Sequence, residues 1–243
     1  MDPLTTTRLL NLWETCLPLS AARRSMYLLS VAFPGDDISS LSVGQCNGRL
    51  LQFRQQLFGN RLPSLAVCPV CSQTAEWEQD VLDFQSGPTE PGQAIGPLDI
   101  RLDPYTVHFR LPGIADIETL KNLNTAEEKQ QHLLKRCILN AYKKEEVCPV
   151  SELPETIIQQ IEAKMAATDP LADVRILLNC PSCGHAWEAV FDVQSYLWKE
   201  LNAWARNLFK EIYTLAKFFG WGETELLAMS HQRRQLYLKM IWG

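Results

Sequence analysis

Apolar positions in the first sixty residues recur with helical spacing and predict three helices. The first carries Leu9, Leu10, Trp13 and Leu17, and the second runs from about 20 to 33 and ends near Pro34-Gly35. The third begins after Ser42 and ends near Gly59-Asn60. This part of the chain is therefore expected to be entirely helical.

The remainder of the chain mixes the two periodicities. Strand-like alternation occurs at 98–102, 106–111, 174–178 and 187–193, and a loop rich in Gly, Pro, Ser and Gln fills 85–96. Helical spacing predicts helices over 114–123, over 125–142 with Ile138 and Tyr142 on it, and from Pro154 to just before Asp169-Pro170. A longer stripe precedes Gly220 and consists of Leu197, Leu201, Leu208, Ile212, Leu215 and Phe219. Two short helices follow, at about 223–229 and 232–242.

Eight cysteines supply the strongest chemical signal. Two Cys-x-x-Cys pairs stand far apart, Cys68 with Cys71 and Cys180 with Cys183. Two cysteines three apart in a tight turn can bind the same ion, proline after the first helps to set the turn, and Ser72 or Gly184 after the second permits the close backbone approach. Two such knuckles give zinc its preferred four tetrahedral ligands. A Trp-Glu dipeptide follows each pair, at Trp77-Glu78 and Trp187-Glu188, so we predict one structural zinc per chain.

Other interpretations of the cysteines stay open at this stage. The pairs are alternatively free buried thiols in strand turns, or a redox pair of the thioredoxin kind, which needs a helix after the cysteines rather than a polar strand. Cys16, Cys46 and Cys137 lie in helical patterns as small apolar residues, and Cys148 has no partner three residues away. His185 is either a turn residue or a competing ligand.

These patterns together predict an α+β fold that is mainly helical. We expect an N-terminal helical region at 1–62, a split zinc ribbon formed by 63–84 and 173–193, a small inserted α/β segment at 85–172, and a C-terminal helical bundle at 194–243. The insertion accounts for the long separation of the two knuckles.

Catalytic signatures are not found in the sequence. Four cysteines leave zinc no open position for water, and the chain has no phosphate-binding glycine loop, Gly-x-Ser-x-Gly elbow or His-Glu-x-x-His motif. Asp36-Asp37 is interpreted as a helix-capping loop. The chain is therefore expected not to be an enzyme and to take no small-molecule substrate.

The net charge of −5 argues against a general nucleic-acid binder, since such proteins gather positive charge. No apolar run reaches the roughly 20 residues that span a bilayer, and the N-terminus lacks the pattern of a secretion signal. These features predict a cytoplasmic protein with no membrane partner.

Short motifs in a fixed order carry a resemblance to a known family. They are Phe58-Gly59-Asn60-Arg61-Leu62, Arg110-Leu111-Pro112 with Asp116 and Leu120, Asp169-Pro170-Leu171-Ala172-Asp173, Cys180 to Trp187, Phe191-Asp192, Leu197-Trp198-Lys199-Glu200, Ala205-Arg206, Leu215-Ala216, Phe219 to Glu223, Leu226-Leu227, Arg233-Arg234 and Tyr237-Leu238. Over about residues 45 to 242 the chain resembles the baseplate hub assembly chaperones of T-even-type contractile phages, whose relatives occur in contractile injection systems.

The resemblance implies a role in building or completing a contractile-tail baseplate in a bacterial cell, with hub, spike or wedge proteins as partners. Whether the protein is an assembly chaperone or a permanent subunit of a phage-tail-like particle stays open. Trp198, Trp204, Trp221 and Trp242 in the C-terminal helices are either core residues or partner anchors, because tryptophan is enriched at interface hot spots. The alternatives are a zinc-ribbon module for nucleic acid or transcription, and an enzyme with an unrecognised site.

Overall fold

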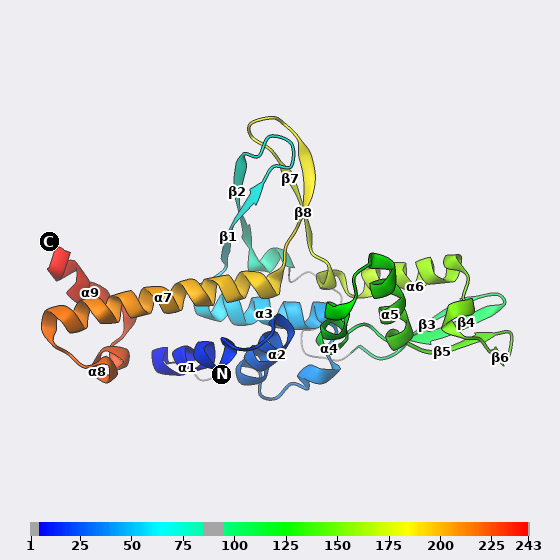
Figure 1. The fold of residues 1–243 in the computed structure, drawn as a ribbon, viewed down its shortest axis with the longest axis horizontal. Helices are drawn as coiled ribbons and strands as arrows, with labels where there is room; N and C mark the ends of the chain where they lie inside the picture. The colour runs from blue at the N-terminus through cyan, green and yellow to red at the C-terminus, as the bar shows by residue number, and fades with distance from the viewer. Residues whose placement is uncertain (1–4, 85–94, 243) are drawn as a thin grey trace. The chain divides into compact units, whose positions relative to one another are not determined.

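The chain folds into two compact units in a computed structural model that describes residues 5–84 and 95–242. The terminal unit joins Met1–Arg24 to Ser195–Gly243, and the central unit is Ser25–Gln194. Figure 1 follows the elements along the chain. The fold is mixed α+β and mainly helical, as the sequence predicted. The finer division into four regions stays a prediction, and most of the expected loop, residues 85–94, lies outside the described residues.

The regular elements in the described part of the terminal unit are all helices. It contains α1 (Thr6–Cys16), nearly all of α7 (Val193–Phe219), α8 (Glu223–Ala228) and α9 (His231–Trp242), while α2 (Ala21–Ala32) crosses into the central unit. Its core combines Leu10 of α1 with Ala205, Leu208, Ile212 and Leu215 of α7 and Leu226 of α8. The predicted stripe along α7 is thus buried, except that Phe219 at its end is 37% exposed.

Local signals end α7 and attach α9 to it. Gly220 has a φ of +70°, which glycine adopts without steric cost, and its N–H donates to the carbonyl of Ala216. Arg234 of α9 is only 2% exposed, and its guanidinium donates to Glu211 of α7 at 3.0 Å and to the carbonyl of Met229 at 2.6 Å. An arginine buried in this way holds α9 in place because leaving its charge unpaired would be costly.

The central unit begins with helices and continues into three antiparallel sheets. Its elements are the rest of α2, η1 (Ile38–Ser40), α3 (Val43–Phe58), β1 (Arg61–Val67), β2 (Thr74–Asp80), η2 (Val81–Phe84), β3 (Leu98–Leu102), β4 (Tyr105–Phe109), α4 (Ile114–Glu118), η3 (Thr119–Asn122), α5 (Ala126–Cys137), β5 (Ile138–Lys143), β6 (Glu146–Val147), η4 (Val150–Glu152), α6 (Glu155–Thr168), η5 (Pro170–Ala172), β7 (Arg175–Asn179) and β8 (Ala186–Val190). Strands β1 and β2 form one hairpin, β7 and β8 another, and β3-β4-β5-β6 a four-stranded sheet. Helix α6 packs on that sheet, with Ile157 and Ile161 against Val107 and Phe109.

The helix predicted over 125–142 is wrong beyond Cys137. Helix α5 ends there, and Ile138 and Tyr142 belong to strand β5, which pairs with β4. The register shifts between His108 and Phe109, so the buried residues of β5, Ile138 and Ala141, are three apart rather than two. A bulge of this kind gives the buried residues of a strand the spacing that is expected of a helix. The sequence pattern therefore does not distinguish the two, and the pairing with β4 shows that this segment is a strand.

The start of α3 is a point to which segments from much later in the chain attach. Ser42 and Gln45 form a capping box at the start of the helix. The backbone N–H groups of the two residues between them donate to acceptors far along the chain. The N–H of Val43 donates to the carbonyl of Pro112, and that of Gly44 donates to Asp169 Oδ2 at 2.9 Å. The side chain of Asn47 donates to the carbonyl of Leu171. Burial raises the pKa of Asp169, while the hydrogen bond from Gly44 and the partial positive charge of the helix N-terminus oppose that shift.

A second buried carboxylate, Asp116, organises the segment after β4. It is 3% exposed and accepts from Arg110 at 2.6 and 2.9 Å, from Arg136 at 2.8 Å, and from the N–H of Gly113. Desolvation opposes ionisation of Asp116, but the hydrogen bonds from Arg110 and the others outweigh it and hold its pKa at about 2. Asp116 and Asp169, two residues that carried the family resemblance, are therefore structural anchors.

Gly44 offers a test of the attachment at α3. A Cβ at this position would lie 2.1 Å from Asp169 Oδ1 and 2.8 Å from the backbone nitrogen of Ala172. We expect Gly44→Ala to lower the free energy of unfolding by about 1–3 kcal/mol, as overpacking does. Chemical denaturation measures the change.

Gly48 in the same helix is the matched control. A Cβ there would meet only Leu171 Cδ1, at 3.4 Å. Gly48→Ala should be neutral or raise stability by up to about 1 kcal/mol, because alanine favours a helix interior over glycine. Equal destabilisation by the two substitutions would contradict the role given to Asp169.

Candidate metal centre

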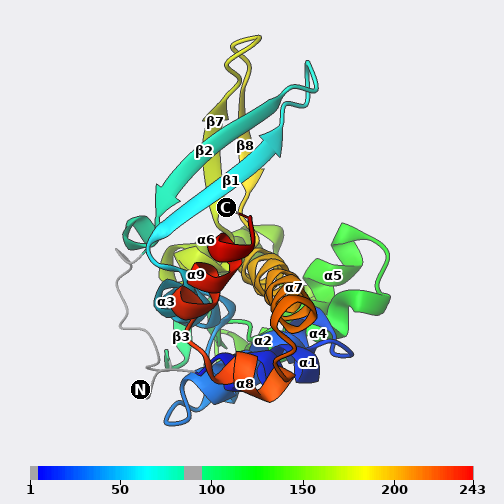
Figure 2. The same ribbon diagram turned by 90° about the vertical axis from the view of Figure 1, so that its left-hand side faces the viewer.

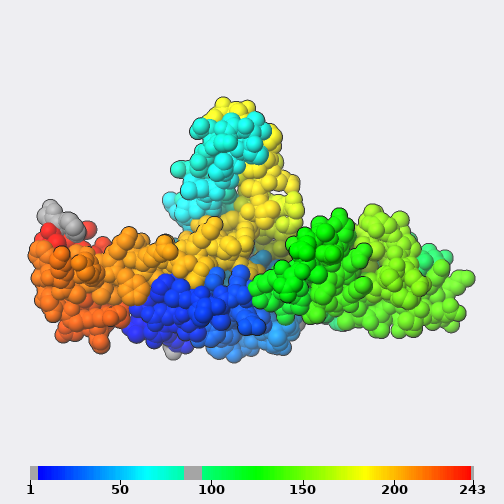
Figure 3. Space-filling model, viewed as in Figure 1, coloured from blue at the N-terminus to red at the C-terminus, as the bar shows by residue number. Residues whose placement is uncertain are grey.

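Two hairpins of the same design hold the cysteine pairs. In both, a six-residue loop joins strands in full antiparallel register: Val67 pairs with Thr74 around Cys68–Gln73, and Asn179 pairs with Ala186 around Cys180–His185. Figures 1 and 2 show the hairpins side by side with their loops at the same end, and in Figure 3 their cyan and yellow atoms lie together. Residues separated by most of the central unit thus meet at two neighbouring loops.

The loops have matching backbone hydrogen bonds. Cys68 donates its N–H to the carbonyl of Gln73 and accepts from the N–H of Ser72, while Cys180 donates to His185 and accepts from Gly184. Ser72 and Gly184 occupy the same position with φ of +59° and +72°. Gly184 adopts this left-handed conformation without steric cost, whereas Ser72 adopts it in spite of its Cβ.

The four sulfurs converge on one point. Cys68 Sγ lies 3.7 Å from Cys183 Sγ, Cys71 Sγ lies 3.5 Å from Cys180 Sγ, and all four are within 4.8 Å of one another. Four thiolates arranged tetrahedrally at 2.3 Å from a zinc ion are about 3.8 Å apart. The donor set and its spacing therefore fit a single four-coordinate metal ion.

Electrostatics at the four sulfurs favour a bound cation. The backbone N–H of Cys183 points to the sulfur of Cys180 and, against desolvation, lowers the pKa of that thiol to about 6. The N–H of Gln73 acts in the same direction on Cys71, but desolvation and the three neighbouring thiols outweigh it and raise its pKa to about 12. Four clustered thiols do not all ionise by themselves, whereas a metal ion deprotonates them together.

Burial alternates along both hairpins and defines an inner face. In the first hairpin the inner pairs, counted from the loop, are Ala66 with Ala75, Ser64 with Trp77, and Leu62 with Gln79. In the second they are Leu178 with Trp187, Ile176 with Ala189, and Val174 with Phe191. Because the loops share one cluster of sulfurs, we infer that these two faces pack against each other.

Large and small residues alternate between the inner faces. In the inner pair next to the loop, the first hairpin has two alanines, Ala66 and Ala75, and the second has Trp187. In the next inner pair, the first hairpin has Trp77 and the second has Ala189. The two Trp-Glu dipeptides are thus offset by one pleat, although the sequence pattern treated them as equivalent. The offset places the two indoles at different distances from the sulfurs, so that both fit between two-stranded sheets.

The other sulfur and imidazole groups lie away from the cluster. Cys16, Cys46, Cys137 and Cys148 are buried, as expected of apolar cysteines, and burial raises the pKa of the first three to about 11, 12 and 11. The ring of His185 stacks on that of Trp187 at 6.3 Å. Among the described residues, the group with metal-ligand geometry consists of the four predicted cysteines and does not include His185.

The Asp36-Asp37 pair has a structural role, as the sequence suggested. Asp37 accepts from the N–H of Ser39 at the start of η1, and Asp36 pairs with Arg49 at 2.7 Å. A separate observation concerns membranes: among the described helices, none is long and apolar enough to cross a bilayer.

Comparisons with known proteins supply the family. Neither the curated proteins nor the solved structures gave a match to the chain. The family model described as "T4 bacteriophage base plate protein" matches residues 27–198, which cover both hairpins and the insertion between them. The C-terminal motifs from Ala205 onward lie outside the match. The chain belongs to the T4 bacteriophage base plate protein family.

Proposed function

We propose that this base plate protein is a non-enzymatic, zinc-stabilised component that acts in the assembly of the baseplate hub. The observation that carries the proposal is the convergence of Cys68, Cys71, Cys180 and Cys183 inside the segment that matches the family. Four thiolates fill a tetrahedral zinc site and leave no position for water, which is the pattern of a structural rather than a catalytic site.

Zinc is the metal that the donor set favours. Tetrahedral all-sulfur sites take zinc or iron, and two knuckles around one ion are typical of structural zinc. The ion would join the two hairpins at their loops and thereby fix both ends of the insertion. The hairpins would then present a rigid surface to a hub, spike or wedge protein, in the cytoplasm where tails are built.

Exposed side chains on the outer faces support a binding role for the hairpins. Leu65 and Leu177 occupy equivalent positions, three residues before Cys68 and Cys180, and are 67% and 70% exposed. Each stands directly across from a glutamate, Glu76 or Glu188. Apolar side chains kept in solvent at matching sites are typical of protein contacts.

The metal content is the first test. Protein purified without chelator should contain about one zinc per chain and no stoichiometric iron, as elemental analysis would measure. Removing the ion with a chelator should lower the midpoint of thermal unfolding, because metal binding at a structural site is largely folding free energy. Protein that contains no metal would contradict the site.

The second test compares two cysteines. Cys180→Ser should unfold or aggregate the protein at growth temperature, because binding to a structural zinc site is largely folding free energy. Cys46→Ser is the control: Cys46 is buried in α3, 1% exposed, and outside the sulfur cluster. Its midpoint of thermal unfolding should fall far less. Similar melting of the two variants would argue against a metal at Cys180.

The third test concerns assembly. Deleting the gene should leave tube and sheath proteins made while baseplates fail to form, as seen by electron microscopy of the particles. A plasmid copy should restore assembly, and a Cys180→Ser copy should not. Particles that assemble normally without the gene would rule out the assembly role but would leave the zinc site standing.

A further inference from the structure

The terminal unit differs in charge from the rest of the protein. It holds ten Lys and Arg against six Asp and Glu, whereas the central unit holds thirteen against twenty-two. The family match ends at residue 198, so nearly all of the terminal unit lies outside it. A basic helical unit therefore accompanies an acidic central unit that contains the metal centre.

One face of α9 combines positive charge with exposed apolar groups. Arg233, Leu236, Tyr237 and Met240 are spaced by three and four residues and therefore share this face. Leu236 is 58% exposed and Met240 is 71% exposed, while Lys239 lies at the margin, also exposed. Within the described residues, neither Arg233 nor Lys239 forms an ion pair with an acidic side chain.

The two adjacent arginines of α9, Arg233 and Arg234, have different environments. Arg234 turns inward to Glu211, whereas Arg233 remains outside, with its guanidinium 5.8 Å from the ring centre of Tyr237. Tyr237 packs edge-on against Phe219 and Trp221, at 5.7 and 4.7 Å. Packing against these aromatic rings keeps this face of α9 rigid, so less conformational entropy is lost when a partner binds.

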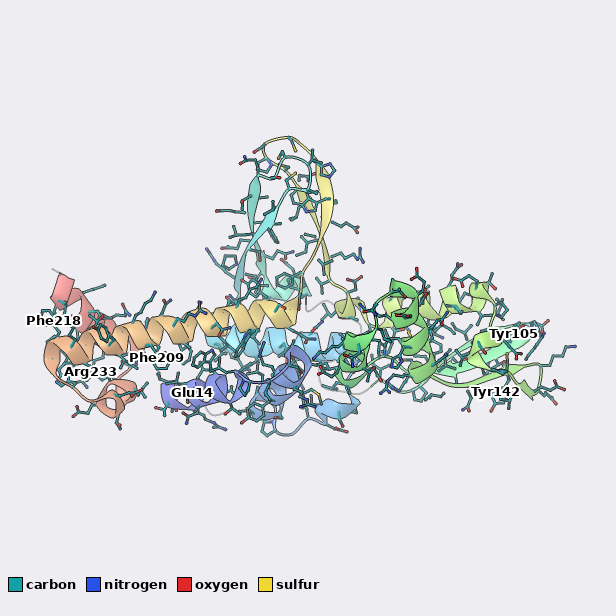
Figure 4. All side chains as sticks on the ribbon, viewed as in Figure 1. Glu14, Tyr105, Tyr142, Phe209, Phe218 and Arg233 are labelled. Carbon is teal, nitrogen blue, oxygen red and sulfur yellow. The ribbon has the colours of Figure 1, made fainter. Side chains whose placement is uncertain are left out.

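A further exposed apolar side chain, Phe218, lies at the end of α7. Its ring lies 5.8 Å from that of Phe219, and 64% of it is exposed. Figure 4 shows Phe218 and Arg233 at the same end of the terminal unit, where α7 finishes near α8 and α9. We call the surface formed by Arg233, Leu236, Tyr237, Lys239 and Met240 the α9 surface.

The tryptophans do not supply this exposed surface. Trp198, Trp204 and Trp221 are partly buried, Trp198 beneath the guanidinium of Arg24 at 3.8 Å. The side chain of Trp242 lies outside the described residues. The groups left in solvent are those that adapt to a partner, since methionine fills irregular gaps and arginine pairs with carboxylates.

We infer that the α9 surface docks an acidic segment of another tail protein, with apolar side chains of that segment covering Leu236 and Met240. The inference rests on the proposed function, because a baseplate component must contact other tail proteins. Charge complementarity sets the chemistry of the partner: uncompensated Arg233 and Lys239 favour carboxylates beside the apolar contact. A protein partner is favoured over a lipid surface because baseplates are assembled from proteins.

The test uses the deletion strain and full-length variants. Leu236→Asp with Met240→Asp should reduce incorporation into particles by about tenfold or more, as loss of interface anchors does. Arg233→Glu with Lys239→Glu should do the same, while zinc content and thermal unfolding stay unchanged in both. Val147→Asp is the matched control, because Val147 is 80% exposed on β6 of the central unit.

A photo-crosslinker, p-benzoylphenylalanine in place of Met240, identifies the occupant. We expect an adduct within an acidic segment of another tail protein, formed less at high salt. Normal incorporation of both double variants would overturn the inference, as would an adduct with a second copy, no adduct, or binding of the purified protein to phosphatidylglycerol vesicles. Normal particles in the deletion strain would instead overturn the proposed function, which keeps the two failures distinct.

Discussion

Joining two hairpins at their loops is the constraint on which the central unit depends. A two-stranded sheet is marginal alone, because it has few backbone hydrogen bonds and little apolar surface to bury. The inner faces contain only three residue pairs each, and two members of these pairs are polar, Ser64 and Gln79. Such small faces need a further link, and the four sulfurs of the loops are placed where a single metal ion would provide one.

A second attachment closes the same part of the chain at its other end. The chain leaves the first hairpin, forms the four-stranded sheet with α5 and α6, and returns through Asp169 to the N-terminus of α3. Helix α3 leads directly into β1, and η5 leads into β7, so both hairpins start from segments that touch one another. Each closure of this long loop costs conformational entropy that the contacts at its ends must offset, and the two sets of contacts together favour one arrangement of the hairpins.

The two units divide the chemistry of the protein. The central unit holds the sulfur cluster, matches the base plate family and is acidic; the terminal unit is basic and exposes apolar groups on α9. A metal site formed entirely by cysteines is suited to holding shape, and an exposed apolar surface with unpaired cations is suited to contact. The proposed metal centre and the proposed docking surface thus belong to different units of the chain.

The sequence by itself determined the features that depend on neighbouring residues. The cysteine spacing, the small residue after each pair, the capping box at Ser42 and the stop at Gly220 are local, so their structures follow from short-range sterics and hydrogen bonding. Only the tertiary structure decided the features that need distant partners. Strand β5 exists because β4 pairs with it, and its bulge gives Ile138 and Ala141 a helix-like spacing. Gly44 is required because Asp169 reaches its N–H. Such contacts join residues far apart along the chain, and no pattern among sequence neighbours encodes them.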